Sequence, residues 1–201
     1  MNLIIVSGFP GTGKTTISKK LVKKYHYSFL SKDLFKEKLF EEYGFKSVEE
    51  KKEIDKKAEQ LFYEKLKCNV DNDIDTIVDK WLQGIHLIEK IISNKDVTLI
   101  FIRLICNPQV ACDRYNKRII SGERPSSFVA LNRYPVDTHT AFEKAMTVES
   151  MNEKASRKFD RTGINNLMEI DTSNIEDRFD QIFEEITEFT DKNIGIQQWI
   201  S

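Results

Sequence analysis

The stretch SGFPGTGKTT, residues 7–16, follows directly after the apolar run LIIV. Its spacing satisfies the pattern G-x-x-x-x-G-K-[ST]. Glycines in this pattern let backbone N–H groups wrap a phosphate, the lysine reaches the outer phosphates, and the hydroxyl after it holds Mg²⁺. A strand before the loop and a helix after it, aimed at the anion by its N-terminus, complete the motif. The predicted nucleotide-binding residues of this loop are Gly8, Pro10, Gly11, Thr12, Gly13, Lys14, Thr15 and Thr16.

Strand-like and helix-like segments alternate along the rest of the chain. Strands are expected at residues 3–8, 27–31, 75–81, 97–105 and 167–173. The helix after the third strand is expected to begin at Trp81, and capping boxes at residues 47–50 and 173–176 predict two further helix starts. Five strands alternating with helices predict an α/β fold with a parallel sheet covered on both faces. The length of 201 residues fits one domain, residues 1–201, and the irregular stretch at about 121–140 is predicted to be a lid.

Composition excludes several classes of protein. Apolar residues make up 40% of the chain and charged residues 31%, with a formal net charge of −1. This balance is typical of a soluble globular protein, and it provides no basic field that would recruit nucleic acid. The three cysteines form no C-x-x-C pair, which argues against a zinc site or a disulfide scaffold. We expect a cytoplasmic protein without a signal peptide or a transmembrane span.

Two classes of nucleotide hydrolase are disfavoured by what the sequence lacks. A switch GTPase should read guanine through an N/T-K-x-D motif, but in NKDV, residues 94–97, the aspartate comes one residue early. A motor or transporter ATPase would carry a longer apolar run ending in Asp-Glu, which does not occur. A phosphotransferase therefore becomes the leading interpretation.

The segment LSKDLFKE, residues 30–37, follows the second predicted strand. In a doubly wound sheet this point faces the phosphate loop across the cleft. Asp33 could accept the proton of an attacking hydroxyl, and Lys32 or Lys36 could hold an anionic part of the acceptor. The alternative is that Asp33 only caps the helix that follows.

Further candidates come from the third strand and from the helix after the fourth. Asp79 ends the third strand, where it can hold Mg²⁺ through water, although it can also be an ordinary strand-end aspartate. Arg114 and Arg118 are four residues apart on one helical face, and Arg124 follows in the predicted lid. Guanidinium groups carried by a closing lid would stabilise the charge on a phosphoryl group in transfer. The alternative is a solvated basic face.

Taken together, the motifs GFPGTGKTT, SKDLFK, VD, DRYNKR…GER and EIDTS resemble those of the small P-loop kinases. The similarity is to the branch that contains polynucleotide 5′-hydroxyl kinase, chloramphenicol phosphotransferase, gluconate kinase and zeta-toxin-like proteins, and it covers about residues 2–189. The resemblance implies a P-loop NTPase fold with a five-stranded parallel sheet, and it implies Mg-ATP as the phosphoryl donor. By the same resemblance, Asp33 activates the acceptor hydroxyl, Arg114 and Arg118 contact ATP and the phosphoryl group, and Asp171 and Thr172 lie near the nucleotide base.

The chain departs from its relatives at two positions. Lys36 stands where many relatives carry arginine, and Pro125 stands where many carry histidine after the lid arginine. Because lysine cannot make the planar two-bond grip on a phosphate, the first departure disfavours a nucleoside monophosphate acceptor.

The resulting expectation is an ATP-dependent kinase that phosphorylates a hydroxyl group of a small molecule. The predicted catalytic residues are Lys14, Asp33, Arg118 and Arg124, and the predicted metal residues are Thr15 and Asp79. Polynucleotide 5′-hydroxyl kinase and nucleoside monophosphate kinase remain alternatives, as does a regulator that binds ATP without catalysis. Nucleic acid is a less favoured acceptor because few aromatic residues interleave with the basic ones.

Overall fold

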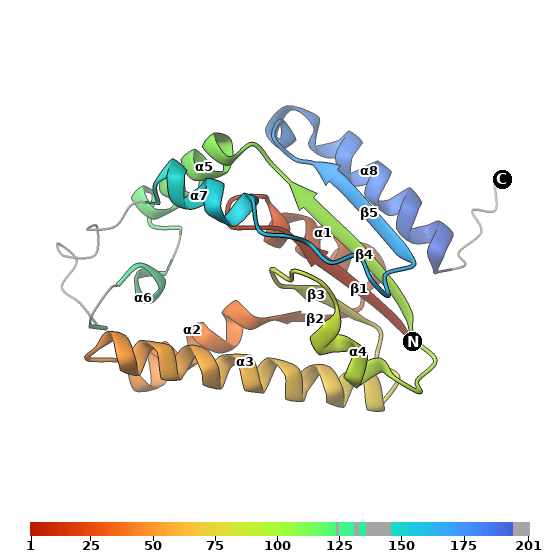
Figure 1. Ribbon diagram of the computed structural model, residues 1–201, viewed down its shortest axis with the longest axis horizontal. Coiled ribbons are helices and arrows are strands. Elements are labelled where there is room, and N and C mark those ends of the chain that lie inside the picture. The colour runs from red at the N-terminus through yellow and green to blue at the C-terminus, as the bar shows by residue number, and fades with distance from the viewer. Residues whose placement is uncertain (124, 131–132, 136–145, 195–201) are drawn as a thin grey trace.

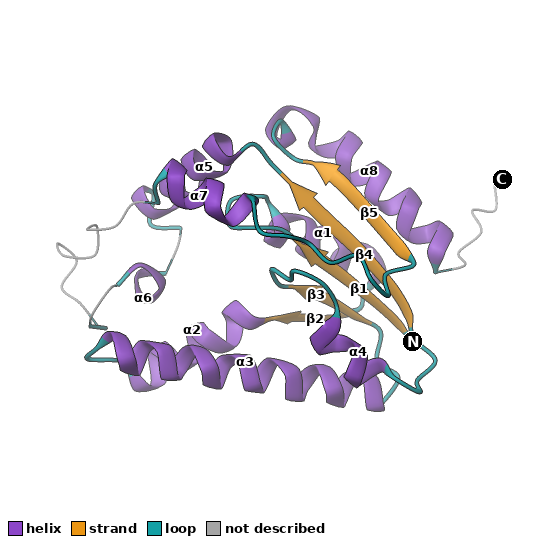
Figure 2. Cartoon of the chain, in the orientation of Figure 1, coloured by secondary structure: helices purple, strands orange, loops and turns teal. Residues whose placement is uncertain are grey.

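The computed structural model of the protein describes residues 1–123, 125–130, 133–135 and 146–194. Its strands are β1 (Asn2–Ser7), β2 (Ser28–Ser31), β3 (Thr76–Asp79), β4 (Thr98–Ile105) and β5 (Asn166–Asp171). Its helices are α1 (Lys14–Tyr25), α2 (Lys32–Tyr43), α3 (Val48–Asp71), α4 (His86–Ile92), α5 (Pro108–Ile120), α6 (Ser126–Val129), α7 (Val148–Ala155) and α8 (Ile175–Asn193). Strands and helices alternate through most of this order, as the sequence predicts (Figure 2).

The five strands form one parallel sheet in the order β2-β3-β1-β4-β5. β1 and β4 occupy central positions, and β1 is an almost uninterrupted apolar run because both of its faces are covered. The order reverses between β1 and β4, since the chain adds β2 and β3 on one side of β1 and then β4 and β5 on the other. Ligands of such sheets bind beyond the carboxyl ends of the strands at this reversal.

Alternate residues of the central strands point to two separate hydrophobic layers. Ile4 and Val6 face the layer covered by α1 and α8, whereas Leu3 and Ile5 face the layer covered by α3 and α4. The two layers lie on opposite faces of the sheet (Figure 1). The predicted α/β fold with helices on both faces of a five-stranded parallel sheet is confirmed.

Some predicted boundaries are wrong in instructive ways. The third strand ends at Asp79, and the next helix begins at His86 instead of Trp81. Residues 80–85 form a loop because tertiary hydrogen bonds hold them over β1: Lys80 N–H donates to the carbonyl of Val6, and the Ser7 hydroxyl bonds both polar backbone groups of Leu82. These contacts outweigh the local helical periodicity.

The two capping predictions have different outcomes. Ser47 caps α3, since its side chain accepts a hydrogen bond from the Glu50 N–H. Ser173 is not the cap of α8, which begins after Asn174 without a side-chain cap bond. Instead, the Ser173 hydroxyl lies 2.6 Å from Asp171 Oδ1 and accepts from the Asn107 N–H, and thereby links the ends of β4 and β5.

Within the described ranges, no helix has both the length and the apolar character needed to cross a membrane. The predicted lid is described in part: it contains the short helix α6 and residues 133–135, whereas Arg124, residues 131–132 and residues 136–140 lie outside the described residues.

Candidate nucleotide and acceptor site

The phosphate loop joins β1 to α1 at the carboxyl edge of the sheet. Its backbone enters the left-handed region at Gly11 (φ 86°) and Gly13 (φ 88°), and glycine takes these conformations without the strain of a Cβ atom. Space is also restricted, because a Cβ at Gly11 would lie 2.2 Å from the carbonyl oxygen of Ala111 on α5. Helix α1 begins at Lys14, so its first N–H groups face the loop. The predicted context of strand, loop and helix N-terminus is present.

Lys14, Thr15 and Asp79 come together beside this loop. The Thr15 hydroxyl donates to Asp79 Oδ2 over 2.7 Å, and the Lys14 ammonium lies 3.2 Å from the carbonyl oxygen of Phe9. Asp79 is only 6% exposed, and burial raises the pKa of its carboxyl group, an effect that the Lys14 charge and the Thr15 hydrogen bond partly offset. A hydroxyl and a carboxylate oxygen are the ligand types that Mg²⁺ prefers, so the pair fits a magnesium site.

Asp33 lies in the first turn of α2, at the same edge of the sheet. In the strand register Asp79 is opposite Ser31, and Asp33 follows two residues later. After burial, the negative charge of Asp33 is a further cause that raises the pKa of Asp79, which indicates that the two carboxylates are near each other. Asp33 is exposed, and no described residue donates a hydrogen bond to its carboxylate or forms an ion pair with it. The capping alternative is therefore not supported.

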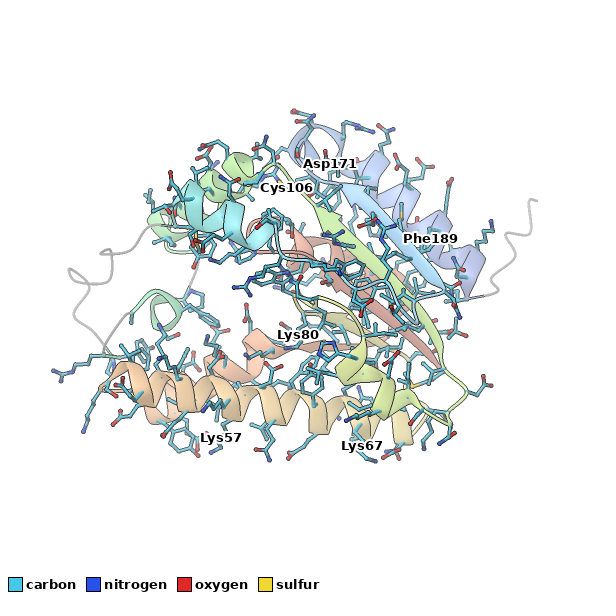
Figure 3. All side chains as sticks on the ribbon, viewed as in Figure 1. Lys57, Lys67, Lys80, Cys106, Asp171 and Phe189 are labelled. Carbon is cyan, nitrogen blue, oxygen red and sulfur yellow. The ribbon has the colours of Figure 1, made fainter. Side chains whose placement is uncertain are left out.

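Lys32 and Lys36 are paired with acidic residues of α3. Lys32 lies 2.9 Å from Asp55 and 2.7 Å from Glu59, Lys36 lies 2.7 Å from Asp55, and Lys80 lies 2.6 Å from Glu59. Burial alone would raise the pKa of Asp55, but hydrogen bonds from Lys36 and Lys32 outweigh it and lower that pKa. The network fastens α2 and the end of β3 to α3; Figure 3 shows Lys80 between the sheet and this long helix. Both lysines proposed to hold the acceptor are thus already engaged.

Arg114 clamps the loop between β5 and α8. Its guanidinium donates to the carbonyl oxygens of Thr172 (2.9 Å) and Ser173 (2.8 Å), and it forms an ion pair with Glu176. The buried Thr172 hydroxyl lies 2.9 Å from the carbonyl oxygen of Thr12 in the phosphate loop. The resemblance to P-loop kinases implies that Arg114 contacts ATP. Its described contacts are with the protein itself, and they fix the loop after β5, whose Thr172 hydroxyl in turn bonds the phosphate loop.

Asp171 and Arg118 are exposed, in contrast to Thr172. Asp171, at the end of β5 near Cys106, the residue that follows β4 (Figure 3), accepts hydrogen bonds from the N–H and hydroxyl groups of Ser173. Arg118 lies in the last turn of α5, and its side chain forms no ion pair with a described residue. Arg124, the other predicted lid arginine, lies outside the described residues.

The described part of the predicted lid, residues 125–130 and 133–135, contacts α3 and the turn between α2, the helix that carries Asp33, and α3. Phe45 and Tyr134 exchange two backbone hydrogen bonds of 2.9 and 2.7 Å, and their rings stack with centroids 6.1 Å apart. The Lys51 ammonium bonds the carbonyl oxygens of Phe128 and Ala130. These contacts join the lid segment to the α2–α3 side of the protein.

Sequence reasoning missed the residues that stabilise the site from behind. Asp55 and Glu59 are four apart on α3, a spacing that puts them on one helical face, but nothing in the sequence indicates which lysines they meet. The link from Thr172 to Thr12 spans 160 residues, so local patterns do not reveal it.

Known proteins with a similar sequence profile or a similar structure are consistent with a nucleotide-binding α/β fold. A family profile described as an AAA domain matches residues 4–130, more than half of the chain. A search with the sequence among curated proteins gives no match.

Several solved structures share the architecture. A candidate kinase of Chloroflexus aurantiacus superposes with a TM-score of 0.72 at 23% identity, covering 94% of this chain and 97% of its own. A gluconokinase of Sinorhizobium meliloti gives a TM-score of 0.59 at 12% identity, with 97% and 95% covered. An unliganded sugar kinase of a Janibacter species gives 0.58 at 14% identity, with 98% and 99% covered. At these identities the likeness shows a shared fold, and it confirms the resemblance to P-loop kinases at that level.

Proposed function

This chain belongs to the AAA domain family, and we propose that it is an ATP-dependent kinase that transfers the γ-phosphoryl group of Mg-ATP to a hydroxyl group of a small molecule. The observation that carries the proposal is the exposed Asp33 carboxylate, which has no partner among the described residues and lies at the same sheet edge as Thr15 and Asp79. A protein that only holds a nucleotide has no need of a second, unpaired carboxylate there.

The residues around the loop fit the nucleotide and the metal. Gly11 and Gly13 adopt the conformations that a phosphate cradle requires, and the Thr15–Asp79 pair supplies oxygen ligands for Mg²⁺. Bound Mg-ATP would supply the phosphoryl group and neutralise charge on its oxygens. The raised pKa of Asp79, which results first from burial, is the behaviour of a carboxylate placed where a cation would compensate it.

The chain's own residues then have distinct tasks. Asp33 accepts the proton of the acceptor hydroxyl as that oxygen attacks, and Lys14 balances negative charge on the outer phosphates. Arg118 and Arg124 stabilise the charge that spreads over the phosphoryl oxygens during transfer. Arg114 acts as a positioning residue, because its described contacts are to the loop after β5.

The substitution Asp33→Asn tests the assignment of the base. We expect acceptor-dependent ADP release to fall by about 10²–10⁴-fold, with the dissociation constant for Mg-ATP unchanged, because the amide preserves shape but takes up no proton. Glu41→Gln is the matched control, since it removes one negative charge from an exposed position of the same helix. Unaltered turnover in Asp33→Asn would show that the base is elsewhere or that none is needed.

The same experiment separates the alternatives. A nucleoside monophosphate kinase transfers to a phosphate, which needs no base, so its turnover would survive Asp33→Asn. A regulator would bind ATP without transfer to any member of a panel of sugars, nucleosides, antibiotics and 5′-hydroxyl oligonucleotides. A nucleic-acid acceptor is less favoured because two lysines of α1, the most lysine-rich segment, already form ion pairs within the protein. Lys20 pairs with Asp180 and Lys24 with Asp191, both on α8.

A further inference from the structure

A small cavity opens beside the phosphate loop, at the carboxyl ends of β1 and β4. It encloses about 110 Å³, far more than the roughly 10–15 Å³ that one water requires. Its lining includes Gly8, Trp81, Arg103, Cys106, Lys154 and Arg157. The side chains come from three parts of the chain, namely the strand ends, the loop after β3, and α7 with the residues that follow it.

The lining is strongly cationic. It contains two arginines and a lysine but no carboxylate. Neither Lys154 nor Arg157 forms an ion pair with a described residue, and the remaining cation, Arg103, shares the carboxylate of Glu169 with Arg161. One carboxylate therefore serves two guanidinium groups, and the cavity keeps an excess of positive charge.

Aromatic rings hold the two guanidinium groups in place, whereas the Lys154 ammonium donates to the hydroxyl and the carbonyl oxygen of Ser150, one turn earlier on α7. The Arg157 guanidinium lies 4.9 Å from the centroid of the Trp81 ring, and that of Arg103 lies 4.5 Å from the Phe159 ring. With its amide oxygen turned toward the indole, Gln83 accepts from Trp81 Nε1 over 2.6 Å. A stacked guanidinium keeps its N–H groups available at the ring edge, so the cations are prearranged for an acceptor of hydrogen bonds.

We propose that this cavity binds a carboxylate or phosphate group of the phosphoryl acceptor, so that the acceptor is a hydroxyl compound with an anionic end. The assignment of the anion to the acceptor rests on the proposed function. Gly8 and Phe9 of the phosphate loop line the same cavity, so an anion held there lies beside the reacting region. The volume accommodates an oxyanion group and not a sugar-sized molecule, so the hydroxyl-bearing part of the acceptor stays outside it.

Fluorescence of Trp81 provides a direct test. The chain has two tryptophans, so Trp199→Phe leaves Trp81 as the single reporter. This variant is titrated at constant ionic strength with two matched pairs, D-gluconate against sorbitol and glycerol 3-phosphate against glycerol, in the presence of Mg-ADP. We expect a saturable change in emission with at least one anion and none with its neutral partner. The pair that responds identifies a carboxylate or a phosphate ester as the ligand group.

Charge variants assign the response to the cavity. Arg157→Gln should weaken anion binding by about 10–100-fold, the effect of one charge-assisted hydrogen bond worth roughly 1.5–3 kcal/mol. If circular dichroism shows that Arg157→Gln does not fold, Lys154→Gln is titrated in its place. Lys90→Gln should leave the response intact, because it removes one positive charge from an exposed position of α4 that does not line the cavity. The absence of a saturable response to both anions overturns the proposal, as does wild-type affinity in the folded cavity variants or loss of the response in Lys90→Gln.

Failure of the anion-site proposal can be distinguished from failure of the proposed kinase function. Failure of kinase activity would appear as absent Mg-ATP binding or as insensitivity to Asp33→Asn, and neither involves Trp81 emission. An anion response without phosphoryl transfer would leave the cavity site standing and would refute the link to an acceptor.

Discussion

The close approach of α5 to the phosphate loop leads to a quantitative prediction for Gly11→Ala. A non-glycine residue in the left-handed region costs about 1–2 kcal/mol. The new Cβ would also lie 2.2 Å from the Ala111 carbonyl oxygen, whereas a relaxed carbon–oxygen contact is about 3.3 Å. Relieving the overlap requires roughly an ångström of movement between loop and helix, and such overpacking costs about 1–3 kcal/mol. We therefore expect Gly11→Ala to lower the free energy of unfolding by about 2–5 kcal/mol in all.

Gly122→Ala is the matched control, because Gly122 also has a positive φ (73°) but a Cβ there would meet nothing within 4 Å. This control should lose only the backbone cost of about 1–2 kcal/mol. Urea unfolding measures both variants, and calorimetric titration with Mg-ADP measures the site. Gly11→Ala should bind nucleotide at least about tenfold more weakly, because a displaced loop misdirects charge-assisted hydrogen bonds. Equal stability of the two variants together with unimpaired binding in Gly11→Ala would refute the reasoning.

Three further substitutions test other parts of the site. Asp79→Asn should raise the unfolding midpoint at pH 7, because burial raises the pKa of Asp79 and its charged form therefore destabilises the folded protein. The gain in stability should disappear below pH 3.8, the ordinary pKa, where the carboxyl group is protonated in both the folded and the unfolded state. A variant that is less stable than the wild type at pH 7 would contradict this reasoning. Thr172→Val should cost about 1–2 kcal/mol and weaken nucleotide binding, because its hydroxyl bonds the phosphate loop. Thr190→Val, whose hydroxyl donates to the carbonyl oxygen of Ile186 in the same helix, should destabilise the protein without affecting binding. Equal effects of the two substitutions on nucleotide affinity would contradict a role of the Thr172 hydroxyl in holding the loop. Lys51→Met should speed amide exchange at Tyr134 by releasing the lid segment, and unchanged exchange would show that other contacts hold it.

The sequence predicts the fold because its signals are local and mutually consistent. The apolar run of β1, the glycine loop and the helix starting at Lys14 occupy consecutive residues, so one stretch specifies strand, loop and helix. The capping box at Ser47 works for the same reason, since its two partners are three residues apart. Elements of this kind need no knowledge of the tertiary structure.

The start of α4 shows where local reasoning fails. Residues 81–85 continue a helical pattern of apolar positions, yet bonds from Leu82 to Ser7, 75 residues away, draw the chain into a loop. That loop builds a wall of the cationic cavity, so the same long-range contact both invalidates the helix prediction and creates a candidate binding site. A sequence motif identifies residues within one segment, whereas a cavity is lined by residues from several segments.

Whether a charged side chain is available to a substrate also depends on partners that are distant in the sequence. Lys32, Lys36 and Asp33 are neighbours in one motif, and the sequence assigns all three to the acceptor. The structure separates them, because Asp55 of α3 pairs with both lysines whereas no described residue pairs with Asp33. The unpaired carboxylate remains suited to proton transfer, and the lysines serve to hold α2 in position.

The spacing along α5 gives Arg118 a defined relation to the phosphate loop. Ala111 contacts Gly11, and Arg114 bonds the Thr172 carbonyl, whose own hydroxyl reaches the loop at Thr12. Positions 111, 114 and 118 follow the i, i+3, i+7 spacing of one helical face. Arg118 therefore projects from the face that packs on the loop, about two turns or 10 Å along the axis from Ala111. A stiff helix fixed at two points beside the phosphate site carries this exposed guanidinium, which supports its proposed role in charge stabilisation more strongly than the sequence motif alone.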